Sequence, residues 1–172
     1  MSCSQFPGSV AGAFASLNGT GTSAGSGTGR QAALNASSGG VGPFPIVTTL
    51  FAEPINVVST TIDTRDMSRT NNLLTFTGIV NLPVGVSVTL NFQLRRSLND
   101  GTGVSVGSTY TFSTIVTVLE AEAFSFQFLD ADVLPGFYTY TVQLSTNSII
   151  DITPGVSVNN AVLSVLAVAD RR

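Results

Sequence analysis

The chain has 172 residues, of which only 10% are charged, and seven basic and ten acidic side chains give a formal net charge of −3. All seven basic residues are arginine, and the chain contains neither histidine nor tryptophan. The acidic balance excludes a nucleic-acid partner, which requires a basic patch, and the absence of histidine excludes Ser–His catalysis. A soluble domain usually carries about 25% charged residues, so the mean hydropathy of +0.37 predicts a surface that other copies of the chain cover.

Residues 1–42 differ in composition from the rest, and we predict that they form an N-terminal arm. The part from Asn18 to Gly42 is dominated by Gly, Ser, Thr and Ala, which is typical of a flexible coil. A spacer needs no apolar clusters, yet this arm contains several. We therefore expect the arm to contact a neighbouring subunit through five residues: Cys3, Phe6, Val10, Phe14 and Leu17. An unstructured tail remains the alternative.

Cys3 is the single cysteine of the chain, so the fold forms without an intrachain disulfide. It is either a free thiol or bonded to Cys3 of a second chain. The first residues lack the basic and apolar regions of a secretory signal. No apolar run reaches the 18 residues of a membrane span, so we expect neither a conventional signal peptide nor a membrane-spanning segment.

From residue 43 to the end at 172 the pattern predicts one β-sandwich domain. Apolar and polar residues alternate strictly at 86–94, 124–128 and 138–144, with the period of a half-buried strand. Less regular strands are predicted at 46–51, 55–62, 73–80, 109–119 and 156–168, and Pro-, Gly- or Asn-containing turns separate the strands. About eight such strands indicate an all-β fold, an antiparallel jelly-roll-like sandwich.

The predicted strands carry Ser, Thr, Asn and Gln on their outward faces rather than Lys and Glu. Neutral polar side chains lose little hydration energy when another protein covers them. The last strand is apolar on both faces, which suits a central strand or one that a subunit contact covers. We therefore predict assembly contacts for five of its residues: Val162, Leu163, Val165, Leu166 and Val168.

Pairs of carboxylates are the remaining candidates for chemistry. Glu120 and Glu122 precede the strand at 124–128, Asp130 and Asp132 follow it, and Asp63 and Asp66 share a loop. Such pairs serve glycoside hydrolysis, but the tryptophan platforms of sugar-cleaving sites are missing. A calcium site is the alternative, although no calcium-loop motif is present. We expect acids that keep the loops soluble, and we expect no enzyme, no cofactor, no metal and no small-molecule ligand.

The segment Leu134-Pro-Gly-Phe-Tyr-Thr-Tyr-Thr-Val142 resembles the PG-x-Y-x-[FY]-x-V strand of C1q/TNF-like jelly rolls. The arrangement of a Gly/Ser-rich leader, the β body with Ser125-Phe-Gln-Phe128 and the apolar last strand is similar to spore-surface families of Firmicutes, among them endospore appendage subunits. That resemblance implies a jelly roll whose arm docks on a neighbouring subunit. Such subunits carry cysteines in arm and body, whereas this body has none, so a covalent link between arm and body cannot form.

These observations together predict a self-assembling structural subunit of an extracellular or spore-surface filament or layer. Its partner would be the same chain, joined through the arm and through β-edge contacts. A trimeric C1q/TNF-like head or adhesin-type binding module is the first alternative, and it predicts a closed oligomer with a ligand site on its loops. A viral capsid-like shell protein is the second, although Arg30 alone is a poor substitute for a genome-binding basic tract.

Overall fold

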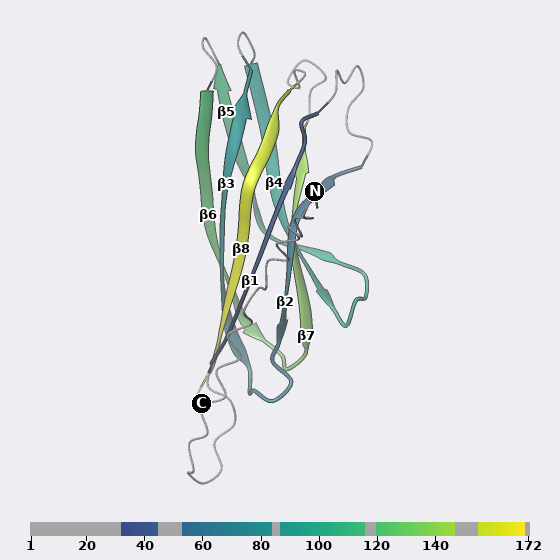
Figure 1. Ribbon diagram of the computed structural model, residues 1–172. Helices are drawn as coiled ribbons and strands as arrows, with labels where there is room; N and C mark the ends of the chain where they lie inside the picture. Colours follow the sequence, from purple (N-terminus) through teal and green to yellow (C-terminus); the bar gives the residue numbers. More distant parts are fainter. Residues whose placement is uncertain (1–31, 45–52, 84–86, 116–119, 147–154, 171–172) are drawn as a thin grey trace, which may run out of the picture.

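The computed structural model describes residues 32–44, 53–83, 87–115, 120–146 and 155–170, and these residues form two four-stranded antiparallel sheets (Figure 1). One sheet has the strand order β1-β8-β3-β6, and the other has the order β2-β7-β4-β5. The strands are β1 (Ala32–Val41), β2 (Ile55–Asp63), β3 (Thr70–Leu82), β4 (Ser87–Leu98), β5 (Val104–Ile115), β6 (Glu120–Val133), β7 (Phe137–Ser145) and β8 (Ser157–Ala169).

The strand order is that of a jelly roll. The first strand pairs with the last, the second with the seventh, the third with the sixth and the fourth with the fifth. This nested pairing arises when a long antiparallel hairpin folds over into two sheets of Greek-key connectivity. The predicted fold class, an all-β antiparallel jelly-roll sandwich of about eight strands, is therefore confirmed.

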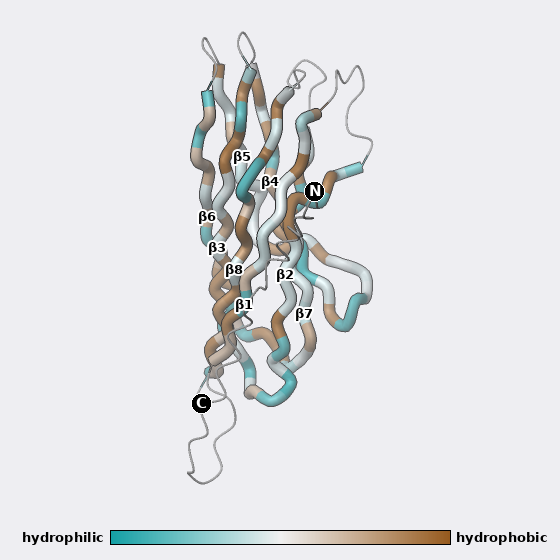
Figure 2. Tube along the Cα trace, viewed as in Figure 1, coloured by the Kyte–Doolittle hydropathy of each residue, from teal (hydrophilic) through white to brown (hydrophobic). Residues whose placement is uncertain are grey.

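The strict alternation in the sequence corresponds to alternation between core and surface. On β4, Val88, Leu90, Phe92 and Leu94 are completely buried between the sheets. On β7, Tyr140, Val142 and Leu144 are buried in the same way. Because successive side chains of a strand point to opposite faces, the polar residues between them form the outer face of the sheet, and hydrophobic segments recur along the strands in Figure 2.

Strand β1 lies within the segment that the sequence predicts to be arm. Residues 32–41 pair with β8 along their length, so the sandwich begins about ten residues before the expected boundary at 43. The composition of this strand resembles that of a flexible coil because small residues dominate it. Their small size is required by the packing of β1 against β2. At Gly39 an added Cβ would overlap the Val57 carbonyl oxygen and lie 3.0 Å from the Val58 Cβ. The predicted strand at 46–51 lies outside the described residues.

Aromatic side chains fill the side of the sandwich between the edge strands β5 and β6. Tyr110 of β5 stacks on Phe126 of β6 with ring centroids 3.9 Å apart, and Phe112 meets Phe124 edge-on at 5.7 Å. These rings close the core where no backbone hydrogen bonds join the two sheets. At the opposite side the backbones of β1 and β2 approach each other closely at Gly39.

Candidate functional sites on the two outer faces

The outer face of the β1-β8-β3-β6 sheet, here called the leucine face, carries a row of four exposed leucines. Leu34 of β1 pairs with Leu166 of β8, Leu166 pairs with Leu73 of β3, and Leu73 pairs with Leu129 of β6. Their exposed fractions are 67%, 37%, 37% and 56% in that order. This leucine row therefore crosses the whole sheet, with one leucine from every strand.

The residues around the leucine row are small, apolar or neutral. Val168 and Val162, which lie on the same face of β8, are 45% and 39% exposed. The next row toward Val162 consists of Ala36, Ser164, Thr75 and Gln127. Single exposed leucines are common on protein surfaces, whereas a contiguous apolar patch marks a contact site. The leucine face is therefore a candidate protein-binding surface.

The structure divides the five predicted assembly residues of the last strand between two environments. Val162, Leu166 and Val168 point outward on the leucine face and are accessible to another molecule. Leu163 and Val165 point into the core and are completely buried, so they offer no surface to a neighbouring chain. The reason is the alternation of the strand: an apolar strand with a central position in the sheet has one face in the core whatever covers the other.

The predicted arm residues Cys3, Phe6, Val10, Phe14 and Leu17 lie outside the described residues. Sequence reasoning missed Leu34, Leu73 and Leu129 as members of one surface. Each has an apolar neighbour in its own strand (Ala33, Leu74 and Phe128), and only the strand register brings it into one row with Leu166.

The outer face of the β2-β7-β4-β5 sheet, here called the polar face, has the opposite character. Three rows of polar side chains cross β2, β7 and β4 in register. The rows are Asn56, Gln143 and Gln93; Ser59, Thr141 and Arg95; and Thr61, Thr139 and Ser97. Arg95 is the one charged residue among these nine, and no apolar side chain interrupts them.

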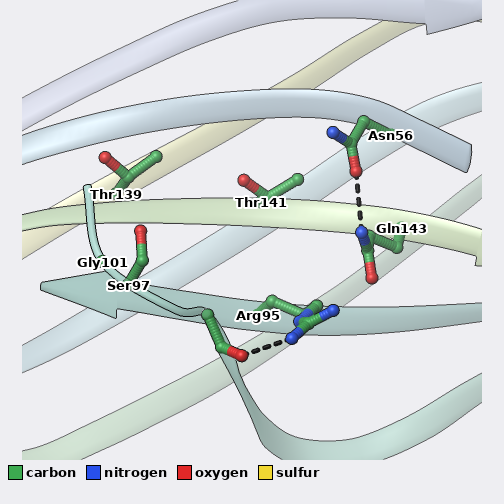
Figure 3. Close-up of a pocket in the computed structure, with 8 residues that line it drawn as sticks. Asn56, Arg95, Ser97, Gly101, Thr139, Thr141 and Gln143 are labelled. Atoms are coloured by element: carbon green, nitrogen blue, oxygen red, sulfur yellow. Dashed lines mark hydrogen bonds between the residues drawn. The ribbon is translucent and has the colours of Figure 1, made fainter. Parts of the chain in front are cut away.

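A pocket of about 210 Å³ lies on the polar face beside the turn that joins β4 and β5 (Figure 3). Its lining comprises Asn56, Arg95, Ser97, Gly101, Gly103, Thr139, Thr141 and Gln143. Arg95 Nη2 donates a hydrogen bond to the Gly103 carbonyl oxygen, which fixes the guanidinium against the turn. Gln143 Nε2 donates to Asn56 Oδ1 at 2.8 Å. The pocket is thus a polar recess with one fixed positive charge.

A hydrogen-bonded polar network lies inside the sandwich and joins its two sheets. Tyr140 of β7 donates its hydroxyl hydrogen to Asp130 Oδ2 of β6 at 2.8 Å, and Asn72 Nδ2 of β3 donates to the Tyr140 oxygen at 2.9 Å. Arg96 Nη1 of β4 donates to the same Asp130 oxygen at 2.7 Å. Burial raises the pKa of Tyr140 well above its ordinary value, so the tyrosine remains a neutral donor. This network belongs to the scaffold, because it faces neither outer surface.

Three of the six carboxylates that the sequence offers for catalysis or calcium are paired with arginines. Asp63 forms an ion pair with Arg65 at 2.6 Å, and Asp132 forms one with Arg69 at 2.6 Å. Asp130 is bound in the network with Arg96. In the described parts of the chain, no three Asp, Glu, Cys or His side chains gather as metal ligands would. Within the same residues, no helix has the length and apolar character that a membrane crossing requires.

Strand order and outer faces together define the class of protein: a jelly-roll β-sandwich with one apolar and one polar outer face. The chain belongs to a family described as a domain of unknown function, DUF4489, whose model matches residues 31–168. The matched segment runs from the start of β1 to the penultimate residue of β8. A comparison with curated proteins gives no match.

Among solved structures, chains of infectious bursal disease virus are similar to this chain. The Gx strain chain is 12% identical with a TM-score of 0.46, and the alignment covers 82% of this chain and 33% of the viral chain. The Gt strain chain is 14% identical with a TM-score of 0.44 and coverages of 80% and 31%. Tailspike protein 4 of bacteriophage CBA120 is 13% identical, with a TM-score of 0.30 and coverages of 77% and 19%. The present chain thus spans about a third of the length of the bursal disease virus chains, and its jelly-roll assignment rests on its own strand order.

Proposed function

We propose that this protein is a structural subunit that self-assembles into an extracellular or spore-surface filament or layer. Copies of the chain join through the N-terminal arm, through β-edge contacts and through the leucine face. The observation that carries the proposal is the leucine row, because four exposed leucines in one register row gain free energy when another molecule covers them.

A second copy of the chain fits the leucine face on physical grounds. Uncharged residues make up three complete rows of this face, from Leu34, Leu166, Leu73 and Leu129 to Ser38, Val162, Thr77 and Ser125. Two such faces meet without repulsion between like charges and without desolvating an ion. Sheets pack face to face at about 10 Å, and a twofold axis would let each leucine row cover the other.

The arm joins the sandwich beside this face. Ala32, the first residue of β1, pairs with Val168, and Leu34 follows two residues later in the leucine row. The 31 preceding residues, fully extended, would span at most about 110 Å, whereas a 13-residue strand such as β8 is about 44 Å long. In our proposal the arm therefore reaches a neighbouring subunit, with Phe6, Val10, Phe14 and Leu17 as its apolar contacts.

Strand edges provide a third type of contact in the proposed assembly. β5 and β6 end their sheets on the same side of the sandwich, and an edge strand presents unpaired backbone donors and acceptors that a further strand can bind. Few charges protect these edges: β5 carries none, and β6 carries two at each end. The location at a spore or cell surface rests on the resemblance of Leu134–Val142 and of the overall arrangement to spore-surface families.

The proposal is tested by sedimentation velocity and negative-stain microscopy of the full chain against two variants. Leu129→Glu places a charge in the leucine row, and Leu134→Glu is the matched control, because both leucines are 56% exposed and Leu134 lies in the turn before β7. We expect assemblies from the full chain and from Leu134→Glu. For Leu129→Glu we expect association at least about 30-fold weaker, the equivalent of losing one buried leucine.

A third variant lacks residues 1–31. We expect this deletion to shorten or abolish the assemblies. If the full chain remains a dispersed monomer at the highest concentration, the proposal is wrong. A discrete trimer that keeps its size with and without the arm would instead establish a closed oligomer.

A further inference from the structure

The pocket on the polar face has features of a ligand site that the amino-acid sequence alone does not predict. Its walls come from three strands and one turn: Asn56 from β2, Arg95 and Ser97 from β4, Thr139 and Thr141 from β7, and Gly103 from the turn before β5. In Figure 3 these polar side chains lie together on three neighbouring strands, and the Arg95 guanidinium lies on the strand that also carries Ser97. Every side chain that lines the pocket is polar or, at the glycines, absent.

Arg95 is the charged residue of the pocket, and its guanidinium is held against the turn. Its Nη2 donates to the Gly103 carbonyl oxygen, whereas its Nε is buried without a hydrogen-bond partner. A buried donor without a partner costs free energy, and among the described residues no carboxylate forms an ion pair with Arg95. Its positive charge is therefore available to an anion that enters the pocket.

The other polar groups of the pocket indicate which functional groups the anion has besides its charge. The Thr141 and Ser59 hydroxyls bond to each other at 2.8 Å, and Gln143 Nε2 is bonded to Asn56. The Ser97 hydroxyl, Asn56 Nδ2 and Gln143 Oε1 have no partner among the described residues. These groups offer both donors and acceptors, which is the complement of a ligand rich in hydroxyl groups.

The charges around the pocket favour a ligand with a single negative charge. Asp100 accepts a hydrogen bond from the Thr139 hydroxyl at 3.4 Å, so a carboxylate lies beside a residue that lines the pocket. A dianion such as a phosphate monoester would face this carboxylate with only one arginine to balance its charge. The volume of about 210 Å³ is below the range of drug-sized sites and suits a single sugar ring.

We propose that this pocket binds a sugar acid, with the carboxylate at Arg95 and the ring hydroxyls at Ser97, Asn56 and Gln143. The pocket has no aromatic side chain on which a neutral sugar would stack, so the ion pair with Arg95 provides the main discrimination. This inference goes beyond the proposed assembly and does not depend on it, because the polar face and the leucine face are on opposite sides of the sandwich.

Equilibrium dialysis of the full chain against radiolabelled glucuronate tests the inference in any assembly state. Glucose is the uncharged counterpart, glucose 6-phosphate the dianionic one, and acetate represents an acidic side chain of another protein. We expect saturable binding of glucuronate and at least about tenfold weaker binding of the other three. Glucose lacks the charge-assisted contact with Arg95, acetate lacks the ring hydroxyls, and glucose 6-phosphate has a second negative charge that a single arginine does not balance.

Arg95→Gln is the variant that locates the site, and Arg65→Gln is its control, because Arg65 is an exposed arginine paired with Asp63 outside the pocket. We expect Arg95→Gln to lose glucuronate binding at least about tenfold while its circular dichroism stays that of the parent, and Arg65→Gln to bind normally. Equal binding of glucuronate and glucose, equal binding of acetate, or full binding by a folded Arg95→Gln protein would each overturn the inference.

Discussion

The two outer faces of this sandwich share one architecture and differ in chemistry. Each is formed by every second residue of antiparallel strands, in rows that the register aligns. On the leucine face the central row consists of four leucines, whereas the rows of the polar face consist of Ser, Thr, Asn, Gln and Arg95. Both inner faces are mainly apolar and share one polar network, so the core does not explain this difference. The contrast supports our proposals of a protein partner for the leucine face and a polar ligand for the polar face.

The largest expected effect comes from placing charges on the leucine face. The double variant Leu34→Glu/Leu129→Glu removes the two most exposed leucines of the row and introduces two carboxylates. Losing about 2 kcal/mol per leucine from the contact weakens association by roughly 1,000-fold. Sedimentation velocity over a concentration series measures this change.

The matched control carries the same charges on the opposite face. Asn56→Glu/Thr139→Glu changes two outward residues of the polar face, and we expect its association to equal that of the parent. Because all four positions are outward, melting temperatures should stay close to the parent value. Equal loss of association in both double variants would show that net charge, rather than the leucine face, controls assembly.

A smaller effect is expected where the leucine face is attached to the other sheet. In Gly39→Ala the new methyl group overlaps the Val57 carbonyl oxygen, so β1, which carries Leu34, must move away from β2. Overpacking of this kind costs about 1–3 kcal/mol. Urea unfolding followed by circular dichroism measures the free energy of unfolding.

Gly103→Ala serves as the control on the polar face. Its added Cβ would lie 3.4 Å from Arg95 Nε, the nearest atom, which is an ordinary contact distance. We expect its unfolding free energy to remain within about 0.5 kcal/mol of the parent. If Gly39→Ala is equally harmless, then β1 is not seated against β2 as described.

A variant in the polar network between the sheets tests the scaffold that both faces share. Tyr140→Phe removes one of the two donors to Asp130, which keeps Arg96, and the acceptor for Asn72 Nδ2. Leaving this buried amide donor unpaired costs about 1–3 kcal/mol. Association and glucuronate binding by the folded protein should not change, because neither face includes this residue. A variant as stable as the parent would contradict this role of the network.

The raised pKa of Tyr140 predicts that the free energy of unfolding decreases at alkaline pH. Burial raises the pKa of Tyr140 above the value of about 10 in an unfolded chain, so the folded state holds the proton more tightly. Its contribution to the unfolding free energy is therefore complete below pH about 10 and decreases as the pH rises further. Burial also raises the pKa of Tyr138. Tyr140→Phe should consequently reduce, but not abolish, the loss of stability in unfolding curves measured at increasing pH.

The sequence predicted strands well where alternation is strict and missed the features that depend on register. Val88, Leu90, Phe92 and Leu94 lie in the core as expected, because a period of two residues determines which face is buried. Strand β1 was assigned to the arm, because composition cannot show that its small residues pack against β2.

The candidate sites were harder to predict for the same reason. Leu34 and Leu129 are 95 positions apart in the sequence, and their places in one row follow only from the pairing of β1, β8, β3 and β6. Arg95 and Thr141 likewise become neighbours through the pairing of β4 with β7. Apolar runs indicated that β8 is central, but they did not separate Leu166 on the surface from Leu163 and Val165 in the core.

The smallest expected effect is that of salt, which should act differently on association through the leucine face and on glucuronate binding at the polar face. The leucine row contains no charges, so raising the sodium chloride concentration from about 0.05 to about 1 M should leave association unchanged or slightly stronger. Glucuronate binding at Arg95 should weaken severalfold over the same range, because salt screens a partly exposed ion pair. Light scattering follows the first and equilibrium dialysis the second. If salt dissolved the assemblies and left glucuronate binding intact, the assignment of an apolar contact to one face and an ionic contact to the other would be reversed.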